Sequence, residues 1–288
     1  MRPGRLRALL ELVRASAALS VPGDLLAGAA AAGRPVKPGL VAGSICLYWA
    51  GMALNDYADR EVDARERPER PIPSGRVSPG AALGASVGLT AAGLALAAVS
   101  GGRRAMAVAV PLAATVWAYD LRLKSTAVGP VAMAACRALN VLLGGRSARA
   151  VPSALLVGAH TAAVTALSRR EVEGTGPAVP TATLAATTAI AVTAATMTGR
   201  AIGGAPAGTR AVTGVLAASY LGSFGRAQVE TVKDGSPPTV RKAVGAGIMA
   251  LIPLQAALIA GSGNLAGALA VVAAHPLASR LARKVSPT

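Results

Sequence analysis

The stretch PGLVAGSICLYWAGMALNDYADREVD, residues 38–63, runs from an apolar segment directly into a cluster of acidic side chains. Residues 38–54 are almost entirely apolar, and a helix needs about 20 such residues to cross the hydrocarbon core of a bilayer. Ionisable groups at the end of a membrane span are costly to place there, so they indicate a functional site by default. The sequence therefore predicts a transmembrane helix with a polar site at its end.

The rest of the chain has the composition of a polytopic membrane protein. Of its 288 residues, 53% are hydrophobic and only 15% are charged, and the mean hydropathy is +0.51. That is too apolar for a soluble domain of this length. The net charge of +16 is spread over the loops between apolar runs, where positive-inside topology explains it better than nucleic-acid binding. No linker is long enough to separate two domains, so we expect one membrane domain over residues 1–288.

Ten apolar runs are long enough to be spans, which predicts an all-α transmembrane helix bundle. They lie near residues 8–32, 38–60, 79–100, 104–122, 128–146, 151–169, 179–199, 208–226, 240–261 and 264–283. Counting ten spans places most loop Lys and Arg residues on the side of the N-terminus, and counting nine leaves a basic C-terminal segment on the other side. The charge distribution therefore favours a multi-pass protein of the cell membrane with both termini and the acidic cluster facing the cytoplasm.

Three carboxylates of the cluster follow one another at helical spacing. Asp56, Asp59 and Asp63 are at i, i+3 and i+7, and Asn55 and Asp59 are at i, i+4, which places them on one face of a helix. Carboxylates this close need a cation, and hard oxygen ligands without His or Cys nearby suit Mg²⁺. An isolated pair of aspartates would more often be a solvated helix end, but the apolar span before this cluster favours a metal site.

The cluster and the loop after it resemble a known motif. Asn55-Asp56-x-x-Asp59-x-x-x-Asp63, followed by Arg67-Pro68-x-Arg70-Pro71-x-Pro73-Ser74-Gly75, is similar to the first aspartate-rich motif of the UbiA superfamily of intramembrane prenyltransferases. The resemblance implies a helical bundle usually described with nine spans. It also implies an isoprenyl diphosphate held through Mg²⁺, with Arg67 or Arg70 neutralising the diphosphate.

Two further elements resemble the same superfamily. Tyr119 and Lys124, with Leu123 between them, are similar to its Y-x-x-x-L-K element, in which the lysine contacts the diphosphate. Taken alone, basic residues at the end of a span are more often snorkelling anchors. Arg137 and Asn140, at i and i+3 in an apolar run, resemble its R-x-x-N element.

An arginine in such a run costs on the order of 2.5–3.5 kcal/mol, so Arg137 should face a polar cavity or pair with a buried carboxylate. Arg14 in the first run allows the same two interpretations.

The second acidic motif departs from the superfamily pattern. UbiA enzymes carry aspartates after the sixth span, whereas this chain has Glu171 and Glu173. Residues at i and i+2 share no helical face unless the helix unwinds, so we expect one of them to bind metal and leave the other open. Proteins of the EboC-like branch of the superfamily look similar at this point.

These resemblances imply Mg²⁺-dependent transfer of an isoprenyl group from a prenyl diphosphate to an unidentified small acceptor within the membrane. The implied catalytic residues are Asp56, Asp59, Asp63 and Lys124. The implied substrate-binding residues are Asn55, Arg67, Arg70, Tyr119, Arg137 and Asn140. The implied metal ligands are Asp56, Asp59, Asp63, Glu171 and Glu173.

Two other functions stay open at this point. A UbiA-type terpene cyclase would ionise the same donor and let the cation close on itself. A transporter or lipid-binding scaffold would place its ionisable groups near the bilayer midplane, whereas here they gather at one face. The expected partners are the prenyl diphosphate, the acceptor and the lipid bilayer, without nucleic acid.

Overall fold

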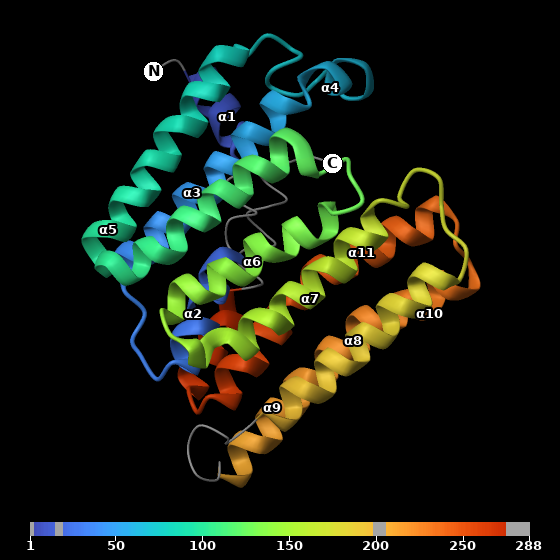
Figure 1. The fold of residues 1–288 in the computed structure, drawn as a ribbon. Coiled ribbons are helices and arrows are strands. Elements are labelled where there is room, and N and C mark those ends of the chain that lie inside the picture. The colour runs from blue at the N-terminus through green and yellow to red at the C-terminus, as the bar shows by residue number, and fades with distance from the viewer. Residues whose placement is uncertain (1–2, 15–19, 198–205, 275–288) are drawn as a thin grey trace.

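The structure is a computed structural model that describes residues 3–14, 20–197 and 206–274 (Figure 1). Within these residues it contains helices and no strands, which confirms the all-α prediction. The α-helices are α1 (Pro3–Leu12), α2 (Val21–Ala31), α3 (Pro38–Ala58), α4 (Arg60–Glu66), α5 (Pro79–Ala118), α6 (Gly129–Gly145), α7 (Val151–Ser168), α8 (Ala178–Thr196), α9 (Ala207–Tyr220), α10 (Arg226–Lys233) and α11 (Pro237–Gly261). Two π-helical turns, η2 (Tyr119–Leu123) and η4 (Leu221–Gly225), follow α5 and α9 directly, and a 3₁₀ turn, η3 (Ala148–Ala150), precedes α7.

Proline marks the beginning of most long helices. α2, α3, α5, α6, α7 and α11 each carry Pro within their first two positions. The first N–H groups of a helix have no intrahelical acceptor, so proline loses nothing there, and its fixed φ favours the helix. The chain can therefore end one apolar run and begin the next within a few residues.

Helix α5 reverses direction at Gly102, where φ is 63° and ψ is −154°. Side-chain-bearing residues rarely adopt this conformation, which glycine tolerates. Figure 1 shows the two legs of α5 diverging from this turn, and α3 contacts both of them. The legs correspond to the runs predicted at 79–100 and 104–122. The first leg packs closely on α3, because a Cβ on Gly43 would meet the backbone oxygen of Gly93 at 3.0 Å.

The buried side chains form two main cores. One contains Leu40 and Leu47 of α3 with Ala105 and Ala109 of α5. The other lies among α7, α8, α9 and α11. Helices α2 and α6 contribute to both, since Leu25 and Leu143 belong to the first core and Ala27 and Val141 to the second. The two halves of the bundle therefore meet along α2 and α6.

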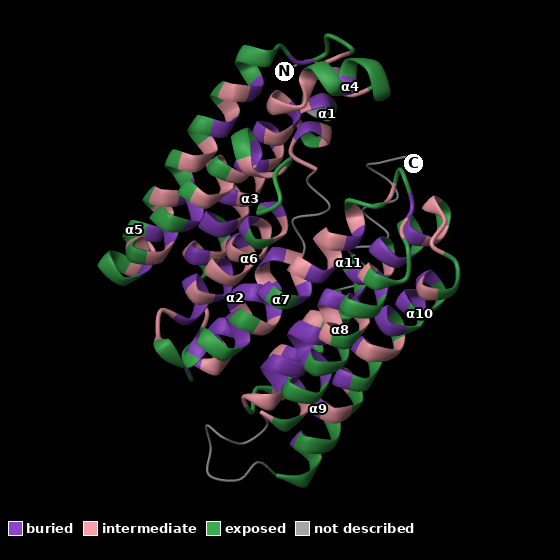
Figure 2. Ribbon diagram, turned by 45° about the vertical axis from the view of Figure 1, so that its right-hand side comes forward, coloured by how far each residue is buried: buried purple, intermediate pink, exposed green. Residues whose placement is uncertain are grey.

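The outer faces of the bundle are apolar. Figure 2 shows exposed residues along the outer sides of α5, α8 and α9, and buried residues where the helices meet. Exposed side chains on these faces include Val87, Val99, Val192 and Val215. Among the described residues, the segments Pro79–Leu123, Ala148–Ser168, Ala178–Thr196 and Pro237–Gly261 are long and apolar enough to cross a membrane, and Gly129–Gly145 and Leu265–Ala274 are shorter apolar helices. The count of nine or ten spans stays a prediction.

The predicted first span is not one continuous helix. α1 ends at Leu12 and α2 begins at Val21, with residues 15–19 outside the described part. Arg14 has a positive φ of 45°, which is incompatible with a continued helix, and α2 begins at Val21. The ends of the predicted runs 179–199 and 264–283 also lie outside the described residues.

Candidate functional site

The acidic cluster forms two neighbouring faces of a helix that is interrupted at Asp59. Asn55 and Asp59 face η2, where the Asn55 amide nitrogen donates to Asp120 Oδ1 over 3.2 Å and Lys124 Nζ lies 2.5 Å from Asp59 Oδ1. Asp56 and Asp63 face the loop after α4. The backbone bonds from Asp59 N to Asn55 O and from Asp63 N to Asp59 O continue the helical spacing through the interruption. The single face expected from the sequence is therefore divided in two.

Two arginines hold the second of these faces. Arg70 Nη1 lies 2.7 Å from Asp63 Oδ2 and 3.4 Å from Asp56 Oδ1, and Arg14 Nη2 lies 2.9 Å from Asp56 Oδ1. Asp56 and Asp63 are only 4% and 3% exposed, so these cations compensate two carboxylates that water scarcely reaches. The contact of Arg70 with a ligand stays a prediction, and its partners in the structure are the aspartates.

The loop that carries Arg70 is fixed by its own backbone and by α1. Ser74 N donates to Arg70 O over 3.0 Å, and Val77 N donates to Pro71 O over 2.9 Å. Ile72 and Val77 of this loop are buried together with Ala8 and Leu12 of α1. The N-terminal helix thus packs on the loop and helps to hold Arg70 against the carboxylates.

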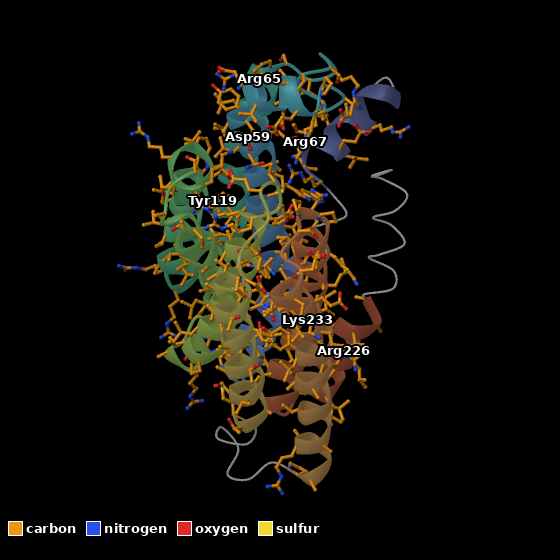
Figure 3. The ribbon with its side chains drawn as sticks, turned by 90° about the vertical axis from the view of Figure 1, so that its right-hand side faces the viewer. Asp59, Arg65, Arg67, Tyr119, Arg226 and Lys233 are labelled. Carbon is orange, nitrogen blue, oxygen red and sulfur yellow. The ribbon has the colours of Figure 1, made fainter. Side chains whose placement is uncertain are left out.

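The π-helical turn η2 presents Asp120 to the bundle interior. A π turn inserts one extra residue into a helix and rotates the side chains that follow it. Asp120 is 4% exposed and lines a pocket together with Tyr119. In Figure 3, Asp59 and Arg67 lie at one end of the molecule and Tyr119 lies just below them.

The pocket runs from η2 into the bundle between α2, α3, α5 and α6. Its empty volume is about 580 Å³ when the open solvent at its mouth is included. Most of its lining is apolar, with Leu47, Met52, Leu112, Val116 and Met133 among the residues that form it. A compartment of this kind accommodates a hydrocarbon chain, with polar groups at its ends to orient the ligand.

A buried polar network forms part of the pocket wall and includes a residue that the sequence analysis missed. Asp24 of α2 is fully buried. It accepts hydrogen bonds from Arg137 Nη2 at 3.1 Å, Asn140 Nδ2 at 2.9 Å and Gln255 Nε2 at 2.7 Å. Ser44 hydrogen-bonds the side-chain oxygen of Asn140. Asp24 is thus the buried carboxylate that the sequence analysis allowed as a partner for Arg137. Its signal was an acidic residue within the apolar run of residues 8–32.

Glu171 and Glu173 lie at the same end of the bundle but outside the first cluster. Arg169 Nη1 donates to Thr126 O, which joins the end of α7 to the segment after η2. Glu171 O accepts from Arg241 Nη1 over 3.1 Å. Burial raises the pKa of the half-buried Glu171 carboxyl above its ordinary value, and the charges of Arg241 and Arg67 oppose that shift. Glu173 is exposed. A role for either glutamate as a metal ligand stays a prediction.

The donor chemistry of the first cluster fits Mg²⁺. Asp56 and Asp63 both direct a carboxylate oxygen at one nitrogen of Arg70, so they converge on a single cationic position. Mg²⁺ typically takes one or two carboxylates and completes its shell with water and phosphate oxygens. Within the described parts of the chain, no three His, Cys, Asp or Glu side chains are grouped closely enough to hold an ion by themselves. A two-carboxylate site completed by substrate is the arrangement that these residues support.

Comparison with known protein families assigns most of the chain to one of them. A family model described as the UbiA prenyltransferase family matches residues 21–225. Digeranylgeranylglyceryl phosphate synthase of Methanopyrus kandleri is 41% identical over 156 residues, which cover 51% of this chain and 56% of that relative. The synthase of Methanothrix thermoacetophila is 36% identical over 146 residues, 49% of this chain and 54% of that relative. The chain thus spans about half the length of the curated relatives it matches.

Solved structures share the fold over nearly the whole chain. A structure concerned with digeranylgeranylglyceryl phosphate synthase in membranes gives a TM-score of 0.66 at 18% identity and covers 90% of this chain and 98% of that one. A UbiA homologue from Archaeoglobus fulgidus bound to DMAPP and Mg²⁺ gives a TM-score of 0.61 at 18% identity, with 92% of this chain and 99% of that one covered. At these identities the likeness concerns the fold, and it confirms a UbiA-like helical bundle.

Proposed function

Because the chain belongs to the UbiA prenyltransferase family, we propose that it transfers an isoprenyl group from a prenyl diphosphate to a small acceptor within the membrane. The observation that carries this proposal is the position of the apolar pocket, which begins at Tyr119 and Asp120 beside the acidic cluster. One end of an amphiphilic donor would meet charged groups, and the other would lie among apolar side chains. The relatives named as prenyltransferases support the same chemistry.

The charged end of the site supplies the groups that a departing diphosphate needs. Asp56 and Asp63 would hold Mg²⁺, which when bound would neutralise diphosphate oxygens as charge develops on them. Lys124 and Arg70 place positive charges at the same end. Preplaced cations of this kind stabilise the charge that forms when the bond between the allylic carbon and the diphosphate oxygen breaks. Arg67, exposed between this cluster and Glu171, would attract the donor.

The transfer also requires an acceptor and a base. The acceptor oxygen would form the new bond to the allylic carbon, the diphosphate would leave with the electron pair of the broken bond, and a carboxylate would take the acceptor proton. Asp120 is the one acidic side chain among the residues of this pocket. We assign the proton to it. The names of the relatives favour a glyceryl phosphate acceptor.

The chain is a multi-pass membrane protein, and we propose that its polar end faces the cytoplasm from the cell membrane. The ten-span count places most loop Lys and Arg residues on that side, as the positive-inside rule expects. We also propose that residues 1–288 act as one domain, because α2 and α6 belong to both main cores. The decisive assay incubates purified protein with Mg²⁺ and prenyl diphosphates of graded length, with and without glyceryl phosphates. Prenylated acceptor supports the proposal, and hydrocarbon or alcohol formed from the donor alone indicates a cyclase.

Replacing Lys124 with Ala is expected to weaken donor binding. The KM for prenyl diphosphate should rise on the order of tenfold or more, because a charge-assisted contact with the diphosphate is lost. Arg122→Ala is the matched control, since Arg122 is an exposed basic residue of the same turn. Steady-state kinetics at varied donor concentration measure the effect, and equal KM values in the two variants would contradict the role of Lys124.

Replacing Met133 with Trp is expected to shorten the preferred donor. The larger side chain would fill part of the pocket that Met133 lines. The ratio of kcat/KM for a long donor to that for a short donor should then fall on the order of tenfold. Val131→Trp makes the same change two residues earlier, on the exposed side of α6. A ratio unchanged by Met133→Trp would place the isoprenoid chain elsewhere.

A further inference from the structure

Two guanidinium groups occupy the position at which the proposed function needs a metal ion. Arg70 Nη1 bridges Asp63 Oδ2 at 2.7 Å and Asp56 Oδ1 at 3.4 Å. Arg14 Nη2 adds a second contact to Asp56 Oδ1 at 2.9 Å. The geometry points to a cation exchange, an inference that rests on the proposed function. Arg14 and Arg70 neutralise the two aspartates when no metal is bound, and the metal binds by displacing them.

The carboxylates require a cation whether or not metal is present. Asp56 and Asp63 are almost completely buried, and a buried charge without a partner is strongly destabilising. Asp56 Oδ1 accepts from both guanidinium groups. A carboxylate oxygen has two lone pairs, and on Asp56 Oδ1 both are taken by guanidinium N–H groups, so a metal ion can bind this oxygen only by replacing one of them. Metal and arginine therefore compete for this oxygen.

The backbone of Arg14 indicates that its position is imposed. Its φ of 45° is unfavourable for a residue with a side chain. The turn is fixed by a hydrogen bond from Arg14 N to Glu11 O over 3.0 Å, and Glu11 is itself paired with Arg76 of the Arg70 loop. Leu12 is buried against the same loop. Such a conformation persists only where its surroundings enforce it, and here the result is the contact with Asp56.

The exchange has a measurable consequence for metal affinity. Because Arg14 must leave Asp56 before metal can bind that oxygen, the ion pair between them weakens the binding of metal added alone. The displaced guanidinium groups then meet the anionic end of the donor, so the same two arginines serve both states. By linkage, donor and metal should each raise the affinity for the other.

The test measures binding of Mn²⁺ alone to the purified full chain by electron paramagnetic resonance, without donor or acceptor. Arg14→Ala is expected to tighten Mn²⁺ binding about threefold to fivefold, the range of a partly exposed ion pair. Arg7→Ala is the matched control, because it removes the same charge from the N-terminal segment. The Arg7 side chain pairs with Glu11 and not with Asp56. Guanidinium ion added to Arg14→Ala should restore the weaker affinity. Equal or weaker Mn²⁺ binding by Arg14→Ala would overturn the exchange.

Two further arms separate the outcomes. If Arg14→Ala does not fold, Arg14→Lys keeps the charge but loses the fork geometry, and it should tighten Mn²⁺ binding in the same direction by a smaller factor. Absence of tightening in this variant would also overturn the exchange. Asp56→Asn tests the metal site itself. If the wild type and Asp56→Asn bind Mn²⁺ equally, the proposed metal site fails. If only the wild type binds and Arg14 has no effect, the exchange alone fails.

Discussion

Mg²⁺-dependent release of diphosphate from a prenyl donor is expected to fall by more than about 100-fold in Asp56→Asn, a loss typical of removing a principal electrostatic contributor. Asn keeps the size of the side chain but removes the negative charge that faces Arg14 and Arg70. Because Asp56 and Asp63 converge on one position, Asp63→Asn should have a similar effect. Release of diphosphate from detergent-solubilised protein, measured over a range of Mg²⁺ concentrations, gives the result.

Glu61→Gln is the control for this prediction. Glu61 lies between the two aspartates in sequence, but its side chain is 82% exposed and pairs with Arg60. The variant therefore removes one carboxylate from the same helical turn without touching the buried pair. Full activity in Asp56→Asn and Asp63→Asn would show that the aspartates serve only to hold the loop and α1 in place.

Asp24→Ala is expected to destabilise the folded protein by about 3–5 kcal/mol, as breaking a buried ion pair does. Asp24 accepts from Arg137, Asn140 and Gln255, which come from two other helices. Without the carboxylate, Arg137 keeps a charge in the bundle interior and has lost its anionic partner. The thermal unfolding midpoint in detergent should fall sharply, together with the yield of monodisperse protein.

The double variant Asp24→Leu with Arg137→Met distinguishes charge from packing. Replacing both members of a buried pair by apolar residues of similar volume is often neutral, so the double variant should be more stable than Asp24→Leu alone. Asn140 and Gln255 still lose a partner and limit the recovery. A double variant no more stable than the single one would mean that the hydrogen bonds, and not the charge of Arg137, dominate.

The sequence was most informative where local spacing determines position. The run from Pro38 predicted α3 almost to its observed end, and the spacing of Asn55 and Asp59 correctly placed both on one face, toward η2. Helical periodicity fixes such relations because they depend only on residues a few positions apart. The resemblance to the UbiA superfamily is confirmed by the family match over residues 21–225.

Long-range pairing could not be predicted in the same way. The contacts of Asp56 with Arg14 and of Asp24 with Gln255 join residues 42 and 231 positions apart, and no periodicity relates them. The break between α1 and α2 was missed because the apolar character of residues 8–32 continues through it. The break occurs at Arg14, where the ion pair with Asp56 and the packing of α1 favour a positive φ. Composition alone does not reveal such a conformation.

Helices α2 and α6 pack against both cores and also form part of the pocket wall. Ala27 and Val141 face the second core, one or two turns from the pocket-lining Val21 and Arg137 on the same helices. A larger side chain at Ala27 or Val141 would push α2 or α6 toward the pocket without changing a residue that lines it. Substitutions at Ala27 or Val141 are therefore expected to narrow the pocket, and with it the range of isoprenoid chains that we propose it binds.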